Sequence, residues 1–376
     1  MTTIAQAIAN RNTVRCDIPV IGDNVTEGQG ATAFTDRWIC QANSYIRALY
    51  PSTGAGTGGG LGFIPLLDTG EGTFAWPVSA TGTYASQDLG PVRKAALMYG
   101  AASATFTAPD PTTSVQILYY DLNQSGSFTY QVNSGEPVTV SNTMTLAELL
   151  TASIPMSPGD TLTIAQASGL VTPDGIVHYA GDETTGVTFH GCGHFGWAAG
   201  TESNGWNQPE QYGLNWAQCF ANGFPNVAAI GIMLGINDAA TDNDDRTAAE
   251  FTSDLQGLIS TVQGAAPALA DIPLLFIIPY EANESFADTG GWPAYVSAIQ
   301  SVAAGYADSV VVNLAAMMEP VADDPGYYYD DWNPNDEGHA LVGGYVAGAF
   351  PPASPSGLLM AGEYDRPGLL RKPFLW

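Results

Sequence analysis

The segment "TVRCDIPVIGDNVTEG", residues 13–28, decides how this chain folds. Its first nine residues form an apolar run typical of a buried β-strand, and Gly22 and Asp23 follow as a turn signal. Apolar residues within 34–50 then recur at the spacing of a helix. The chain therefore begins with a strand–loop–helix unit, in which Asn24 occupies the first position after the turn.

The composition is acidic and poor in charged side chains. Asp and Glu number 37 and Lys and Arg number 10, which gives a net charge of −27. Partners rich in phosphate require clustered Lys and Arg, so we expect neither nucleic acid nor an anionic membrane surface as a partner. The sequence contains no long apolar segment and no signal-peptide pattern, so we also expect no membrane insertion and no signal peptide. The four cysteines are widely separated, which favours buried free thiols.

Alternation of strands and helices returns in the second half of the chain. The expected strands are 186–193, 227–235, 273–280 and 309–315, and the expected helices are 214–220, 248–262, 292–306 and 335–349. Such alternation predicts an α/β domain in which helices cover both faces of a parallel sheet.

Between these two α/β segments the composition and the hydrophobic pattern change. Residues 62–186 are rich in Gly, Thr and Ser and carry short alternating runs separated by turn residues, which predicts an inserted antiparallel β-sandwich. We therefore divide the chain into a discontinuous α/β domain (1–61 and 187–350), this insertion, and a C-terminal arm (351–376). Within the insertion, "MTLAELLTASI" (144–154) has leucines at a spacing that also fits a short helix.

Four polar segments follow the predicted strands or precede the last helix. They are "GDNVTEG" (22–28), "HGCGHFG" (190–196), "LGIND" (234–238) and "YDDWNPNDEGH" (329–339). In an open parallel sheet the loops at the carboxyl ends of the strands form the binding site. We therefore expect these four segments to meet.

The order and content of the four segments resemble the SGNH, or GDSL, hydrolase superfamily, whose members carry Gly-Asp-Ser, a Gly, Gly-x-Asn-Asp and Asp-x-x-His-Pro-Asn. The matching residues are Gly22 and Asp23, then Gly193, then Gly235, Asn237 and Asp238, and finally Asp330, Pro334 and Asn335. The resemblance implies a flavodoxin-like three-layer αβα fold. It also implies that the Gly193 amide and the Asn237 side chain are oxyanion donors and that Asp330 is the orienting carboxylate.

The chain departs from the superfamily at both reactive positions. Asn24 stands where the family has its serine nucleophile, and Asn333 stands where it has its histidine base. An asparagine amide has no hydroxyl for attack and cannot take up a proton near pH 7. Serine proteases without their triad keep only ~10³ to 10⁴-fold of rate over water. We therefore expect a vestigial site that does not hydrolyse esters.

Histidines nearby offer alternatives for the missing base. Asp336 and His339 form a second Asp-x-x-His, although they lie inside the last predicted helix, where the resemblance places a Gly-His after the true motif. His190 and His194 flank the glycine of the second segment, so either could face the pocket as a base or, with Asp330, as a metal ligand. No metal-ligand spacing supports the latter, and we predict no metal and no cofactor.

The remaining candidates are mostly structural. Cys192 is a conceivable nucleophile, but we expect it to be buried in the sheet. The acidic run 241–247 lacks the spacing of a calcium loop and is expected to cap the following helix. Further residues expected to bind a ligand are Asp23, His190, His194, Asp238, Tyr329 and Trp332, and Trp197, Trp206 and Trp292 are candidates for the same rim or for the core.

The resemblance extends to SGNH proteins of actinobacterial viruses, in which a β-sandwich occupies the same place and the gene lies among tail genes. It implies an inactive tail or virion component that binds a cell-envelope glycan or other virion proteins, as a homo-oligomer or within a larger assembly. The expected location is the virion, or the cytoplasm if the protein is not viral. Two alternatives stay open, namely an active carbohydrate esterase with a non-standard site and a purely structural virion subunit.

Overall fold

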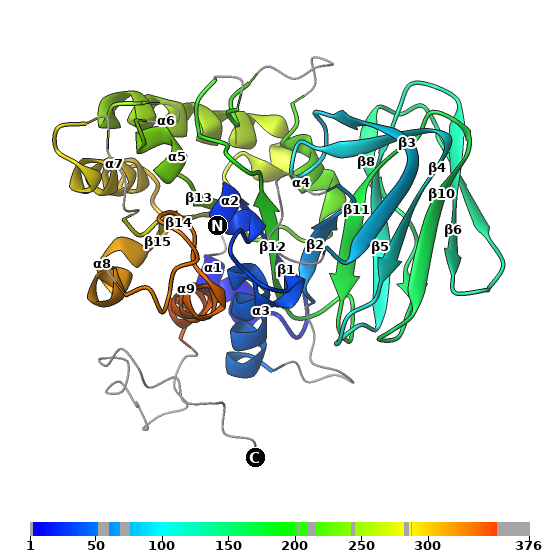
Figure 1. Ribbon diagram of the computed structural model, residues 1–376, viewed down its shortest axis with the longest axis horizontal. Helices are drawn as coiled ribbons and strands as arrows, with labels where there is room; N and C mark the ends of the chain where they lie inside the picture. Colours follow the sequence, from blue (N-terminus) through cyan, green and yellow to red (C-terminus); the bar gives the residue numbers. More distant parts are fainter. Residues whose placement is uncertain are drawn as a thin grey trace.

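The computed structural model describes residues 3–51, 60–67, 76–201, 204–208, 215–241, 245–281, 286, 288–322 and 324–351. The predicted C-terminal arm lies outside these described residues, apart from its first position. An α/β part and a β-rich part lie side by side (Figure 1). None of the helices that the structure describes is long and apolar enough to span a bilayer.

The α/β part is built on a five-stranded parallel sheet. Its strands are β1 (Cys16–Gly22), β12 (Val187–Gly193), β13 (Ile230–Met233), β14 (Leu274–Ile278) and β15 (Val310–Asn313). Their spatial order is β12-β1-β13-β14-β15, and every neighbouring pair is parallel. The four strands other than β15 are buried along their length, as expected of strands covered on both faces. The predicted parallel sheet is therefore present.

Helices pack on this sheet in two groups. Helix α3 (Trp38–Leu49) packs against α9 (Asp336–Gly348), and α6 (Ala248–Ala265) packs against α7 (Trp292–Ala303). Figure 1 shows α3 and α9 on one side of the sheet and α6 on the other. The shorter elements are α1 (Ile4–Ala9), α2 (Asn24–Glu27), α4 (Gln218–Gly223), α5 (Ile236–Ala239), α8 (Leu314–Met318) and three 3-10 turns, η1 (Phe34–Asp36), η2 (Pro267–Leu269) and η3 (Glu319–Val321).

The start of α6 corrects one expectation. Thr247 caps this helix: its Oγ1 accepts the backbone N–H of Glu250, and the Glu250 carboxylate accepts the backbone N–H of Thr247. This reciprocal pair is a capping box. The aspartates of the run 241–247 were expected to cap α6, but Asp245 instead adopts a left-handed backbone with φ of 51°, and 242–244 lie outside the described residues. Thr247, the last residue of the run, therefore caps α6 in place of the aspartates.

The β-rich part consists of two antiparallel sheets. Its strands are β2 (Gly62–Pro65), β3 (Val78–Gln87), β4 (Ala95–Thr107), β5 (Ser114–Asp121), β6 (Gly126–Val132), β7 (Val138–Ser141), β8 (Ala147–Leu150), β9 (Ile154–Pro155), β10 (Thr161–Gly169) and β11 (Thr172–Tyr179). One sheet has the order β3-β4-β10-β6-β7 and the other β2-β11-β5-β8, with β9 also paired to β5. The segment 144–154 thus contains strands, because β8 pairs with the central strand β5.

The two antiparallel sheets bury one common core. Phe106 and Phe128 from the first sheet lie in the same hydrophobic cluster as Ile117 and Ile176 from the second. Two sheets with a shared core are the arrangement of a β-sandwich. That 62–186 is a domain in its own right stays a prediction.

The connection between β3 and β4 anchors this part to the α/β part. Arg93 donates from Nη1 to the carbonyl of Trp206 at 2.8 Å, and its guanidinium lies over the rings of Trp197 and Trp216, at 5.1 and 5.7 Å from their centroids. Asp88 pairs with the same guanidinium through both oxygens, each at 2.6 Å. The connection is thereby fixed beside the carboxyl end of β12.

Candidate functional site

The turn after β1 presents Asn24 at the carboxyl end of the sheet. Asp23 caps α2 by accepting the backbone N–H of Val25 at 3.0 Å. Burial raises the pKa of Asp23 to about 7, and the backbone hydrogen bonds it accepts oppose that rise. A Cβ at Gly22 would lie 2.0 Å from Oγ1 of Thr26, so the tight turn requires glycine there. Asn24 thus becomes the first residue of α2.

Gly193 lies directly beside this turn. It ends β12 and pairs with Gly22 of β1. A Cβ on Gly193 would lie 2.2 Å from the backbone nitrogen of Glu27 and 2.7 Å from the carbonyl oxygen of Asp23. Only a glycine therefore lets β12 approach the backbone of α2 this closely.

Four of the predicted site residues are linked by hydrogen bonds from side chain to side chain. Asn237 donates from Nδ2 to Oδ1 of Asn24 at 3.1 Å, and Asn24 donates from Nδ2 to Oδ1 of Asn333 at 2.5 Å. Asn333 in turn donates from Nδ2 to both carboxylate oxygens of Asp330, each at 3.0 Å. We call Asn237, Asn24, Asn333 and Asp330 the amide chain.

The direction of the amide chain follows from the chemistry of its end. A carboxylate only accepts hydrogen bonds, so Asn333 must turn its NH₂ group toward Asp330 and its oxygen toward Asn24. Asn24 must then donate to that oxygen and offer its own oxygen to Asn237. The Asn237 NH₂ group also donates to the Trp197 carbonyl at 3.0 Å. The three asparagines are 3–5% exposed, so these contacts are well shielded from water.

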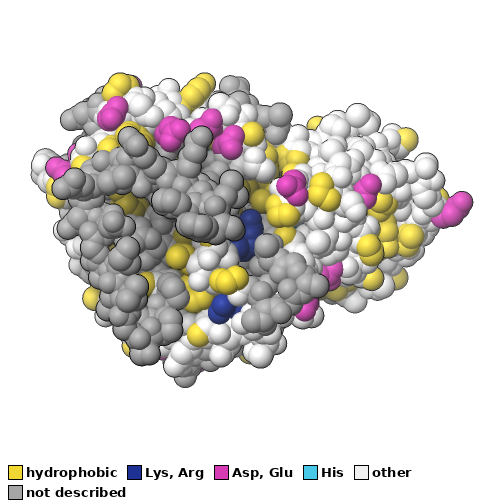
Figure 2. Space-filling model, turned by 90° about the horizontal axis from the view of Figure 1, so that it is seen from below, with side chains coloured by type: hydrophobic (Ala, Val, Ile, Leu, Met, Phe, Trp, Pro, Cys, Tyr) yellow, Lys and Arg dark blue, Asp and Glu magenta, His cyan; other side chains and the backbone are white. Residues whose placement is uncertain are grey.

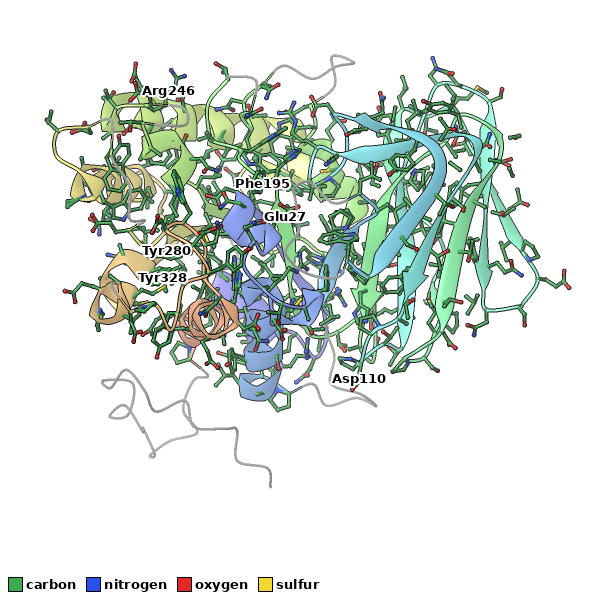
Figure 3. All side chains as sticks on the ribbon, viewed as in Figure 1. Glu27, Asp110, Phe195, Arg246, Tyr280 and Tyr328 are labelled. Atoms are coloured by element: carbon green, nitrogen blue, oxygen red, sulfur yellow. The ribbon has the colours of Figure 1, made fainter. Side chains whose placement is uncertain are left out.

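A short loop before α9 holds the charged end of the chain. One carboxylate oxygen of Asp330 accepts the backbone N–H groups of Trp332 and Asn333, at 2.8 and 2.7 Å. Tyr280, which follows β14, donates its hydroxyl to the Trp332 carbonyl at 2.8 Å and packs edge-on against Tyr328 (Figure 3). The sequence analysis did not select Tyr280, although a tyrosine directly after a buried strand is a signal that would have found it.

The aromatic candidates divide between surface and core. Tyr329 is 56% exposed and Trp332 is half-buried, so both border the loop on its outer side. Trp206 is fully buried and donates from Nε1 to the carbonyl of Gly22 at 3.1 Å, which supports the turn from behind. Trp292 is buried at the start of α7 and does not belong to the rim.

Asp238 lies below the surface next to the amide chain. Its Oδ1 accepts the backbone N–H of Ala199 at 2.8 Å, and its own carbonyl accepts the backbone N–H of Arg246 at 2.8 Å. The residue is fully buried. Asp238 therefore ties α5 to the loop after β12 and positions its neighbour Asn237.

His190 does not face the pocket, contrary to expectation. Its side chain is fully buried, and Nε2 lies 2.8 Å from Oδ1 of Asp17, which also pairs with Arg15 at 2.6 Å. Side chains alternate along a strand, and His190 lies three residues before the end of β12. It therefore points into the core near the start of β1 and reaches none of the amide chain.

The other proposed sources of reactivity are also occupied or buried. His339 accepts the backbone N–H of Trp38 at Nδ1 and donates from Nε2 to the carbonyl of Gln29, at 3.3 and 2.9 Å. Burial lowers the pKa of His339 to about 4. Cys192 is fully buried, which raises the pKa of its thiol. All four cysteines are buried and free, as their spacing predicted.

His194 packs on Trp197, the residue whose carbonyl accepts a hydrogen bond from Asn237. Its ring stacks on Trp197 at 3.8 Å between centroids, and Nδ1 lies 2.6 Å from the carbonyl oxygen of Val92. Burial, with a smaller effect of Lys94 and Arg93, lowers the pKa of His194 to about 3. His194, Trp197 and residues of the β3–β4 connection line a cavity of about 440 Å³. The sequence analysis selected His194 and Trp197 as candidates but did not bring them together with the β3–β4 connection.

Comparison with protein families gives a match to part of the chain. Residues 185–341 match the GDSL-like Lipase/Acylhydrolase family. The matched segment contains Gly193, Asn237, Asp330 and Asn333, whereas Asn24 and the β-rich part precede it. The chain thus contains a domain of the GDSL-like lipase/acylhydrolase type, and its parallel sheet has the SGNH hydrolase fold with additional antiparallel sheets.

Solved structures that resemble this chain include carbohydrate esterases of family 2. The enzyme of Corynascus thermopiles (Myceliophthora fergusii) with its carbohydrate binding domain is 14% identical, covers 72% of this chain and 98% of its own, and has a TM-score of 0.32. The Clostridium thermocellum esterase in complex with cellohexaose is 13% identical, with coverage of 72% and 97% and a TM-score of 0.33. No curated protein matches the sequence. Likenesses this low carry no conclusion about activity.

Proposed function

We propose that the protein is a catalytically inactive SGNH-type homologue that binds a cell-envelope glycan in the region of its amide chain. The observation that carries this proposal is the hydrogen bond between Asn24 and Asn333, because two amides meet where a hydrolase of this type pairs its nucleophile with its base. In this proposal the α/β part is a three-layer, flavodoxin-like unit, with the β-sandwich as an inserted domain.

The amide chain lacks a nucleophile, a base and an open oxyanion donor, which ester hydrolysis requires. Asn24 offers an N–H group in place of a nucleophilic oxygen, and the oxygen of Asn333 has no basic lone pair that takes a proton near pH 7. The Asn237 NH₂ group, which would serve as an oxyanion donor, already donates to two oxygens. A carbonyl substrate would have to displace these contacts without gaining a nucleophile. The amide chain therefore has no means of cleaving an ester, and a glycan bound in this region would stay intact.

An active esterase with a non-standard site is the second candidate, and the family match favours it. Its catalytic groups would have to come from elsewhere. His190, His339 and Cys192 are buried in contacts of their own. His194 is a further candidate base, and it stacks on Trp197 instead of meeting the amide chain. This candidate therefore has weaker structural support.

We further propose a role in a viral particle, as a tail component. The support is the resemblance of the motif order and the place of the insertion to viral SGNH proteins, together with an acidic composition that argues against nucleic acid. The partners would be a cell-surface glycan and other virion proteins, with the chain in a homo-oligomer or larger assembly. A purely structural subunit would share this location and lack the glycan.

Two measurements test the proposed function. First, we expect the purified protein not to hydrolyse 4-nitrophenyl acetate above the rate of a heat-inactivated sample. Turnover that disappears in Asp330→Asn or His194→Gln would establish the active esterase instead. Asp330 belongs to the amide chain and His194 is the alternative base. The variant that loses turnover therefore shows which of the two groups takes part in the reaction.

The second measurement is sedimentation with insoluble bacterial peptidoglycan. We expect the wild type to sediment, and Asn333→Leu to lose at least about tenfold in affinity, which corresponds to ~1.4 kcal/mol. Asn123→Leu, at an exposed position between β5 and β6, is the matched control and should sediment like the wild type. If the wild type stays in solution, or if both variants sediment equally, the amide chain is not the glycan-binding site.

A further inference from the structure

We propose that Glu148 and Asp174 form a proton-dependent latch. With a proton between their side chains, the two carboxyls hold the β3–β4 connection, residues 88–94, against the second antiparallel sheet. When that proton leaves at alkaline pH, the two negative charges repel each other and the connection is released. The latch is a conformational device, and it does not depend on the proposed function.

The two carboxyls come from β8 and β11, which pair with β5 on its two sides. Glu148 lies opposite Tyr120, and Tyr120 lies opposite Thr172, so these three side chains share one face of the sheet. Asp174 lies at the bulge of β11, and its carboxyl is hydrogen-bonded to that of Glu148. Glu148 is 5% exposed and Asp174 is 2% exposed. The pair is therefore shielded from water.

A contact between two carboxyls requires a proton. An ionised carboxylate only accepts hydrogen bonds, so two of them cannot bond to each other. Among the described residues no side chain or backbone group donates to Oε2 of Glu148 or to either carboxyl oxygen of Asp174. A proton on one carboxyl supplies the missing donor, and the other carboxyl accepts it. The pair thus holds together only while it keeps at least one proton.

No basic side chain takes the place of this proton. Among the described residues no Lys, Arg or His contributes to the pKa shift of either carboxyl. The connection carries Arg93 and Lys94, but Arg93 is paired with both oxygens of Asp88, and Lys94 lines the cavity near His194. Basic residues number only 10 in the chain, and few Lys and Arg side chains are visible on the face shown in Figure 2.

The neighbouring acidic group on β5 is occupied elsewhere. Asp121 follows Tyr120 in the chain, and its carboxylate accepts the backbone N–H groups of Thr143, Met144 and Thr145. It is therefore held by the loop before β8 and not by the carboxyl pair.

The sign of the pH dependence follows from burial. Burial raises the pKa of Glu148 to about 7, and burial together with the charge of Glu148 raises the pKa of Asp174 well above its ordinary value. Removing the last proton leaves two like charges in contact, so we expect the pair to keep it above pH 7. Hydrated carboxyls lose their protons at about pH 4. The closed latch therefore binds a proton that the open latch releases, and closure weakens as pH rises.

Gly90 is the point at which the pair holds the connection. Its backbone N–H donates to the Glu148 carboxyl. A Cβ on Gly90 would lie 3.0 Å from Cγ of Asp174, and its φ is 77°, so both the close approach and the backbone conformation favour glycine. Leu89 packs with Tyr120 in a small hydrophobic cluster beside it. The backbone of the connection therefore rests directly on the two carboxyls.

The other end of the connection is anchored in the α/β part. Arg93 donates to the carbonyl of Trp206, and its guanidinium lies over the ring of Trp197. Arg93 and Trp197 also line the cavity of about 440 Å³. Release of the connection at Gly90 would widen this cavity. Because the Trp197 carbonyl accepts a hydrogen bond from Asn237, the change would extend to the edge of the amide chain.

The test is hydrogen–deuterium exchange of the full chain, followed by mass spectrometry of peptides that span residues 88–94. The N–H of Gly90 is bonded to Glu148 and the N–H of Arg93 to the Gly90 carbonyl at 3.0 Å, so both exchange only when the connection opens. The reference is Glu148→Gln, because glutamine keeps an oxygen for Gly90 and offers Asp174 an N–H group in place of the proton.

The measured quantity is the exchange rate of the wild type divided by that of Glu148→Gln at the same pH. Both chains have the same residues around the measured amides, so the intrinsic effect of pH on exchange cancels. We expect the ratio to rise by about tenfold for each pH unit between about pH 7 and 9, because opening releases one proton. A ratio that does not change with pH would overturn the inference.

Two further variants and one further peptide complete the test. Asp174→Asn should match Glu148→Gln, since its amide also donates across the pair, and it serves as a second reference if Glu148→Gln does not fold. Glu136→Gln, at an exposed position between β6 and β7, should behave like the wild type. Loss of the pH dependence in Glu136→Gln would show that the carboxyl pair is not its source. Peptides of β14 should exchange more slowly than 88–94, and equal rates would show that the connection opens only by global unfolding, which would also overturn the inference.

Discussion

Replacing both asparagines, Asn24→Ser with Asn333→His, should convert the protein into a weak esterase. The two side chains already touch, with 2.5 Å between Nδ2 of Asn24 and Oδ1 of Asn333. Serine ends one heavy atom before asparagine, while histidine reaches farther, so the two changes compensate in length. Asp330, now 3.0 Å from Nδ2 of Asn333, would accept the Nδ1–H of the new histidine. Asn237 would be released from Asn24 and could donate to an oxyanion.

The size of the gain can be worked out from this geometry. A complete triad contributes about 10⁶-fold in subtilisin. A misplacement of about 1 Å costs about 100-fold. If the new serine and the new histidine are each misplaced by that amount, about 100-fold remains above the wild-type background. This gain corresponds to a lowering of the activation free energy by ~2.7 kcal/mol.

The assay is kcat/KM for 4-nitrophenyl acetate, measured on both single variants and on the pair. Each single variant should stay at background, since a serine without a base and a base without a nucleophile are both inert. Adding Asp330→Asn to the pair should remove most of the gain. The reasoning would be refuted by a single variant as active as the pair, or by an inactive pair whose thermal unfolding matches the wild type.

Three further results are expected from changes elsewhere. Gly193→Ala should lower the free energy of unfolding by about 1–3 kcal/mol, because its methyl would lie 2.2 Å from the backbone nitrogen of Glu27. The control Gly264→Ala, whose added methyl meets nothing within 4 Å, should raise the free energy of unfolding by about 0.5–1 kcal/mol. Equal shifts of the two variants in urea unfolding would contradict this. Burial raises the pKa of Glu148 from 4.5 to about 7, so the folded state holds more protons than the unfolded state and the free energy of unfolding should fall as pH rises through this window. Urea titrations at several pH values should show this fall flattened in Glu148→Gln, and a rise with pH would contradict the raised pKa of Glu148. Because all four thiols are buried, none should react with a thiol reagent in the native protein and four should react in urea; any native reaction would show that a cysteine is accessible.

The parallel sheet could be predicted because each of its strands can be recognised from its own residues. Runs such as 273–280 are apolar throughout, and helical periods lie between them, so order along the chain was enough to place their carboxyl ends together. The contacts of Asn24, Asn237 and Asn333 follow from that placement. Two motif residues more than 300 positions apart thus meet through the topology of the sheet.

Other features depend on contacts that no local pattern contains. The leucines of 144–154 fit a helix, but pairing with the buried strand β5 decides in favour of strands, since strand preference depends on tertiary context. The direction of His190 depends on Asp17, a partner 173 residues away. The cavity forms because the β3–β4 connection docks Arg93 onto tryptophans of the other part of the molecule. Such docking cannot be read from the residues around Arg93 alone.

The amide chain also obeys a rule of orientation like that of hydrogen bonds in ice. Turning Asn24 alone would place two NH₂ groups face to face on one side and two oxygens face to face on the other, so no single asparagine can reverse by itself. The three amides could reverse only together, and that state would set the oxygen of Asn333 against the carboxylate of Asp330. One negative charge at the end of the row therefore fixes the polarity of every amide in it. The dipoles of the three amides therefore all point the same way, and keeping that direction requires no proton exchange.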